Sequence, residues 1–244
     1  MNAGSLRTLR DGDIAKLIAI ACVAALAWEW LLVGAGVGME EMDMGGGSMM
    51  PMRPEWSWSY AALMLAMWVV MMVAMMLPGA APAMLGGVAA IPFAAGYLAI
   101  WSGFGLAATL AQFALDRWDL ISDAMAVRGD AAPAVLILAA GVYQLTPWKR
   151  SCLRRCAPAA GRDRHLGARE SARLGLRYGV SCLGCCWALM ALLFVAGVMN
   201  LLWAAAIALW VGAEKLLPGG GRIARLAGAG LIAWGSVHLA LAVL

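Results

Sequence analysis

The most restrictive feature of the sequence is a run of 60 residues, Trp56 to Leu115, that contains no Asp, Glu, Lys or Arg. Two helices of about 20 apolar residues joined by a turn account for such a run, because each has to cross a hydrocarbon core about 30 Å thick. Charged residues make up only 13% of the chain, about half the share found in soluble domains. The apolar runs are continuous rather than alternating, which favours helices over a barrel. The expected fold class is therefore all-α, a polytopic transmembrane helical bundle.

The apolar runs divide into about seven spans (six to seven). The first is too long for the apolar region of a signal peptide and has no small-residue cleavage site, so we expect it to remain as a span. Residues 1–37 would then hold the N-terminus and the first span, 38–57 an external loop, and 58–244 the transmembrane bundle with a basic, cysteine-containing loop at 148–178. The expected spans are roughly 14–37, 58–80, 88–115, 131–147, 179–197, 200–217 and 223–244.

The charged residues predict the orientation of the bundle. Segment 149–177 holds nine Lys and Arg residues and two acidic ones. Basic loops stay on the cytoplasmic side, so we expect the loop 148–178 and the N-terminus to be cytoplasmic. The loops at 38–57 and 116–130 then lie outside, and both are net acidic. The basic residues thus reflect membrane topology, and the expected partner is the lipid bilayer rather than nucleic acid.

Five of the six cysteines fall on the expected cytoplasmic side. Cys152 and Cys156 are four residues apart and would share one face of a helix. Cys182, Cys185 and Cys186 lie in the predicted first turns of the fifth span, within an arc of about 100° on a helical wheel. Thiolates at such spacings can share one soft metal ion, Cu(I) or alternatively Zn(II).

Redox chemistry and simple packing are the alternatives to metal binding for these cysteines. They could pass electrons as redox dithiols, although the cytosol keeps thiols reduced. They could also pack as small apolar residues, which is our interpretation of Cys22, alone in the first span.

The external loop contains the segment MEEMDMGGGSMMPM at 39–52, with six methionines and three acidic residues. It has too little apolar bulk to fold alone, and its glycines favour flexibility. Thioethers select Cu(I) and suit an oxidising compartment, where thiols would be lost to disulfides. Met42 and Met44 are therefore candidate ligands for copper capture, and the alternative is a flexible loop without a ligand.

A second group of methionines lies in the second span. Met64, Met67, Met71 and Met75 fall within an arc of about 80° and extend over roughly 16 Å of helix. Methionine is an ordinary gap-filler between helices, so core packing is the alternative to metal binding here. Soft ligands outside, within the membrane and inside could together form a path for Cu(I) from weaker to stronger ligands.

Four motifs carry a resemblance to a known family. They are MWVVMMVAMMLP, YQLTPWKRSCLRRC, YGVSCLGCCWALMALLFVAGVMNLLW and EKLLP. Over roughly residues 56–220 the chain resembles the bacterial proteins known as predicted metal-binding integral membrane proteins, a domain-of-unknown-function group. The resemblance implies a multi-pass protein of the bacterial cytoplasmic (inner) membrane and supports metal binding by the Met and Cys motifs. It implies no reaction.

Three functions remain. The first is copper transport or handling, or service as the metal-binding subunit of a membrane complex, with a membrane subunit or a periplasmic metal-binding protein as partner. The second is a membrane thiol–disulfide oxidoreductase. The third is a structural subunit in which a zinc–cysteine site holds the basic loop to the fifth span. The sequence has no nucleotide-binding loop and no Ser/His/Asp set, so a binding or transport protein is favoured over an enzyme.

Glu214 and Lys215 are expected to pair with each other or with the basic loop.

Overall fold

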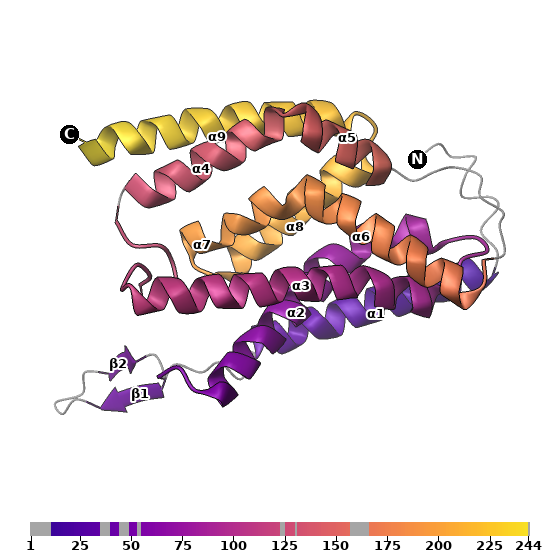
Figure 1. The fold of residues 1–244 in the computed structure, drawn as a ribbon, viewed down its shortest axis with the longest axis horizontal. Coiled ribbons are helices and arrows are strands. Elements are labelled where there is room, and N and C mark those ends of the chain that lie inside the picture. Colours follow the sequence, from indigo (N-terminus) through magenta and orange to yellow (C-terminus); the bar gives the residue numbers. More distant parts are fainter. Residues whose placement is uncertain are drawn as a thin grey trace.

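The computed structural model describes residues 11–34, 40–43, 49–52, 55–122, 125–129, 131–156 and 166–243. The molecule is an elongated bundle in which long helices run roughly along one axis (Figure 1). Within the described part of the chain the elements are α1 (Asp11–Leu32), β1 (Glu40–Asp43), β2 (Met49–Met52), α2 (Trp58–Met84), α3 (Ala90–Arg117), α4 (Ala131–Leu145), α5 (Pro147–Cys156), α6 (Ala168–Ala191), α7 (Leu193–Ala196), α8 (Leu201–Leu216) and α9 (Gly220–Val243).

Several of the helices are long enough to be membrane spans. Among the described helices, five are long and apolar enough to cross a membrane, and α4 with α5 would make a sixth if this pair, bent by 67°, is one span. The expected span at 200–217 corresponds to α8, whose 16 residues are fewer than the ~20 that a span requires. Its start is capped by Asn200, which accepts a hydrogen bond from the Trp203 amide, and Pro218 follows its end, where proline disfavours a continuing helix.

Two segments contain regular secondary structure that the sequence did not predict. β1 and β2 form an antiparallel pair in the Met-rich loop, with Met42 opposite Met50. The basic segment 148–178 is helical at both of its described ends, since α5 ends at Cys156 and α6 begins at Ala168. The three cysteines of α6 therefore lie well inside a helix instead of in its first turns.

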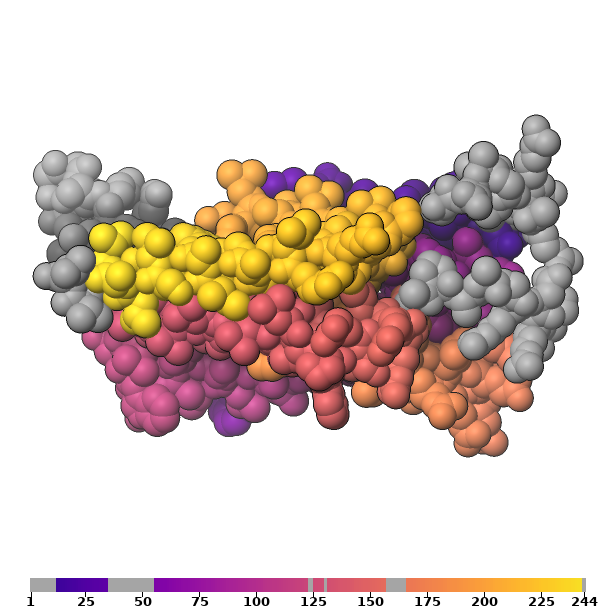
Figure 2. Space-filling view, turned by 90° about the horizontal axis from the view of Figure 1, so that it is seen from above, coloured from indigo at the N-terminus to yellow at the C-terminus, as the bar shows by residue number. Residues whose placement is uncertain are grey.

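Glycine contacts bring α3 and α6 close together. A Cβ atom at Gly96 would collide with the Ala172 carbonyl group, and one at Gly175 would collide with the Phe93 carbonyl group. Small residues at such contacts allow the backbones of membrane helices to approach closely. A second close pair, α4 and α9, lies side by side along one face of the molecule (Figure 2). The α3–α6 contact matters for the site, because it places Tyr97 against the cysteine face of α6.

Candidate metal centre

The buried face of α6 carries three thiols. Cys182, Cys185 and Cys186 are each 1% exposed or less, and their spacing puts them on one side of the helix, as the sequence predicts. Cys185 Sγ lies 3.1 Å from Cys186 Sγ and 3.1 Å from the Cys182 carbonyl oxygen. α6 thus presents a compact group of sulfurs to the interior of the bundle.

The helix α5 adds a fourth thiol to this group. The bend between α4 and α5 turns the chain back towards α6, and the Thr146 hydroxyl accepts a hydrogen bond from the Lys149 amide in the first turn of α5. At the other end of α5, Tyr178 donates to the Cys156 carbonyl oxygen at 2.9 Å. Cys156 is 1% exposed, and its sulfur lies 3.9 Å from that of Cys185.

The separation of Cys156 and Cys185 is suited to a shared metal ion. Two thiolates bound at about 2.3 Å to a tetrahedral or trigonal ion have sulfurs roughly 3.8–4.0 Å apart. The Cys185–Cys186 separation of 3.1 Å is shorter and would have to open. Within the described residues, no group of three or more His, Cys, Asp and Glu side chains is already arranged around one ion position. The arrangement is therefore a thiol pair with further sulfurs at its side.

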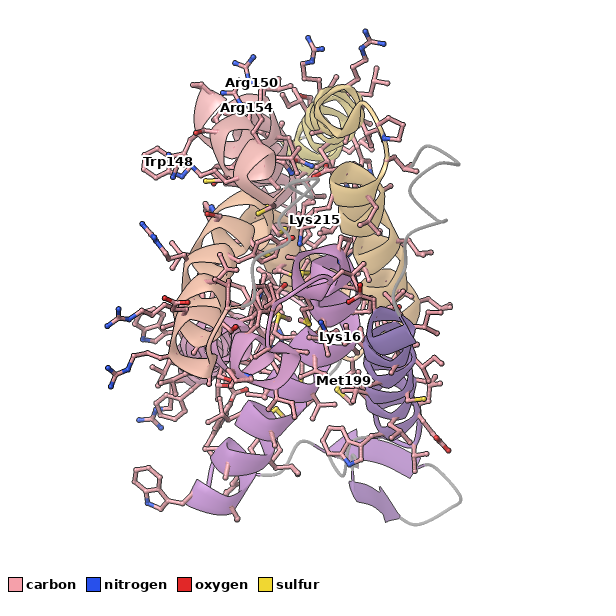
Figure 3. The ribbon with its side chains drawn as sticks, turned by 90° about the vertical axis from the view of Figure 1, so that its right-hand side faces the viewer. Lys16, Trp148, Arg150, Arg154, Met199 and Lys215 are labelled. Carbon is pink, nitrogen blue, oxygen red and sulfur yellow. The ribbon has the colours of Figure 1, made fainter. Side chains whose placement is uncertain are left out.

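Lys215 is a member of the centre that the sequence did not reveal. Its side chain enters between the helices (Figure 3), and its ammonium group lies 2.9 Å from Cys182 Sγ and 3.9 Å from Met76 Sδ. The residue is 5% exposed. The Tyr97 hydroxyl lies 3.1 Å from Cys182 Sγ and donates to the Met76 carbonyl oxygen. A buried ammonium is costly without a partner, and here sulfur atoms are its partners.

Glu214 is buried beside Lys215 but points to different partners. It pairs with Lys149 at 2.6 Å, with side-chain exposures of 2% and 0%, and accepts hydrogen bonds from Gln144 and Trp210. Pairing of Glu214 with the basic segment was one of the two expectations. Pairing of Glu214 with Lys215 was the other, and it is wrong because neighbouring residues of a helix point about 100° apart.

The predicted ligands divide into those that the fold gathers and those that it does not. Cys152 is only partly buried, and its sulfur lies where a side chain at Gly184 would be. Met42 lies in β1, and Met44 lies outside the described residues. By contrast, the methionines of the α2 row are all 5% exposed or less and lead along the helix towards Met76. They are Met64, Met67, Met71 and Met75.

The charged surface of α5 lies opposite its cysteine face. Arg150 and Arg154 are exposed and extend away from the bundle (Figure 3). The sulfur group is thus enclosed by helices, while the basic residues of the same short helix reach the surface.

The fold and these sulfurs define a class: a helical-bundle protein with several helices apolar enough to span a membrane and a sulfur-lined interior. Residues 65–238 match the family model PpoB2, described as "Copper chaperone". The match covers more than half of the chain, so the chain belongs to this family. No curated protein and no solved structure matches this chain. The family description supports a copper-related function and does not favour the oxidoreductase or zinc-staple alternatives.

Proposed function

We propose that the protein is a membrane copper chaperone that binds Cu(I) between α5 and α6. The observation that carries the proposal is the 3.9 Å separation of Cys156 and Cys185, two buried thiols from different helices. These two cysteines would be the primary ligands. Cys182 or Cys186 would supply a third sulfur after a change of side-chain rotamer.

The surroundings of the thiols favour Cu(I) over Zn(II). The Met76 thioether faces the same ammonium as Cys182, and thioethers bind Cu(I) but are not among the usual zinc ligands. A thiol pair with a thioether near the neighbouring Cys182 can hold a monovalent soft ion and release it again by ligand exchange.

The α2 methionines would serve as the route to the thiols. The row is buried along its whole length, and thioethers are weaker ligands than thiolates, so an ion would move towards the cysteines. The orientation predicted from charge puts the hairpin with Met42 outside and the thiols on the cytoplasmic side of the bacterial inner membrane. Met42 and Met44 would collect copper, and a periplasmic metal-binding protein or a membrane subunit would be the partner in exchange.

A competition titration tests the proposed site. The purified protein in detergent is titrated with Cu(I) under anaerobic conditions against a chromophoric Cu(I) chelator. Cys156→Ser and Cys185→Ser should each weaken binding at least tenfold, since each removes half of the primary pair. Cys152→Ser is the matched control on α5 and should change the affinity less than threefold, and exposed Cys22→Ser should have no effect.

The same variants separate copper from zinc. Elemental mass spectrometry of protein expressed with added copper should find about one copper ion per chain, and Cys156→Ser should lose it. Retention of zinc alone, with loss of folding on chelation, would contradict the proposal and restore the zinc-staple function. Equal effects of the Cys152 and Cys156 substitutions would contradict the assignment of the primary pair.

A further inference from the structure

A second group of sulfurs lies at the other end of the methionine row. Met64 is near the start of α2, Met125 lies between α3 and α4, and Gln112 is in the last turns of α3. The Gln112 side-chain nitrogen donates to Met125 Sδ at 2.9 Å and to Met64 Sδ at 3.7 Å. The three residues are 4% exposed or less. Two thioether sulfurs, one from α2 and one from the segment between α3 and α4, therefore face the same amide nitrogen.

The orientation of the Gln112 amide is fixed by a neighbour. Its oxygen accepts a hydrogen bond from the Trp68 indole at 3.0 Å, and Trp68 is fully buried against the rings of Phe104 and Phe194. An indole N–H can only donate, so the amide oxygen must face Trp68 and the amide nitrogen must face the sulfurs. The lone pairs of both sulfurs are accordingly aimed at the position of that nitrogen.

Met125 reaches this position through an unfavourable backbone conformation. Its φ is +57°, which is uncommon for a residue other than glycine. The segment is anchored by pairing of Ile121 with Val127 and by a hydrogen bond from the Val127 amide to the Phe194 carbonyl oxygen. Backbone strain of this kind persists where the surrounding structure enforces it and is found at functional sites. Here it directs a thioether into the bundle.

We propose that Met64 and Met125 form a second metal site, a two-thioether site for Cu(I) at the opposite end of the α2 row from the cysteines. The choice of ion rests on the proposed function. As the ion binds, the Gln112 side chain would turn away from the sulfurs with its amide protons retained, so that two N–H···S contacts are exchanged for two S–Cu bonds and copper remains cuprous throughout. Met125 lies outside every ligand motif of the sequence, and the site would be the entrance to the row.

Methyl NMR with Ag(I), a redox-inert monovalent soft ion, tests this site separately from the thiols. The protein carries ¹³C-methyl methionine, all six cysteines are replaced by serine, and each signal is assigned by a single Met→Leu substitution. Addition of Ag(I) should shift the methyl signals of Met64 and Met125 together. Met125→Leu should weaken the response of Met64 at least tenfold, and Met64→Leu should do the same to Met125.

Met84→Leu is the matched control, because Met84 is equally buried in the same helix but lies at its other end. It should leave both responses unchanged. Should the serine variant be unfolded by circular dichroism, wild-type protein with its thiols first saturated with Ag(I) gives the same readout. Signals of Met64 and Met125 that stay in place, or a Met64 response that survives Met125→Leu, would overturn the outer site. Either result leaves the cysteine titration standing, because that titration measures ions bound to thiols.

Discussion

Replacing Cys182 with alanine would leave the Lys215 ammonium inside the bundle without its nearest partner. The two groups are 2.9 Å apart, and Lys215 is 5% exposed. Among the described residues, the other hydrogen-bond partner of the ammonium is the Met76 thioether at 3.9 Å, which is a weak acceptor. The reverse change, Lys215→Met, leaves a thiol that can remain neutral. We therefore expect the two single substitutions to differ strongly in their effect on stability.

The size of the difference follows from the ordinary ionisation of the two side chains. A buried lysine without a partner can lose its proton. Deprotonation costs about 1.36 kcal/mol for each pH unit by which the solution lies below the ordinary lysine pKa of about 10.4, which is roughly 4.6 kcal/mol at pH 7. Loss of one member of a buried ion pair costs a similar ~3–5 kcal/mol. A thiol is neutral near pH 7 at no such cost, so Lys215→Met should cost only about 1 kcal/mol, that of a hydrogen bond.

Unfolding in detergent micelles measures both values. Cys182→Ala should lower the free energy of unfolding by ~3–4 kcal/mol, a fall of roughly 6–16 °C in midpoint for a chain of this size. Adding Lys215→Met to Cys182→Ala should restore at least half of that loss. Cys186→Ala is the control, because it also removes a buried thiol of α6, but one whose sulfur contacts Cys185 and not the Lys215 ammonium. Equal losses for the Cys182 and Lys215 variants, or a double variant no more stable than Cys182→Ala, would refute the reasoning.

Three further outcomes are expected. Glu214→Gln should destabilise the protein by ~3–5 kcal/mol because it leaves the Lys149 charge buried, and addition of Lys149→Met should recover much of this in the same unfolding assay. Met71→Leu with Met75→Leu keeps the side-chain volume and should cost less than ~1.5 kcal/mol, yet it should slow copper entry into proteoliposomes; an unchanged rate would exclude the α2 route. Gly175→Val should abolish folding or weaken α3–α6 packing enough to lower the yield of monodisperse protein on size exclusion, because there is no space for a side chain at this contact.

Local patterns in the sequence predicted the parts of the site that lie on a single helix. Periodicity put three cysteines on one face of α6, and the expected boundary between the spans 179–197 and 200–217 lies between α7 and α8. The fourth expected span ended at residue 147, and Pro147 is the first residue of α5, after the bend. Each of these features depends on residues within a few positions of one another, which is the range over which helix periodicity and proline geometry act.

The parts that join different helices were not predictable in this way. The approach of Cys156 to Cys185 depends on the bend before α5 and on the packing of α5 against α6. The position of Lys215 depends on α8 crossing both α2 and α6, and no spacing in the sequence records that crossing. Met125 is the hardest case, because a methionine in a connecting segment with positive φ belongs to no periodic pattern.

The last turn of α8 contacts both of the helices that carry the cysteines, α5 and α6. Glu214 binds Lys149 of α5, the helix that carries Cys156, while Lys215 binds Cys182 of α6. The angular offset between these two adjacent residues therefore acts as a fixed spacer between the two thiol-bearing helices. A one-residue insertion earlier in α8 would rotate both side chains by about 100° and detach both helices at once, so that the site would be dismantled with every cysteine intact.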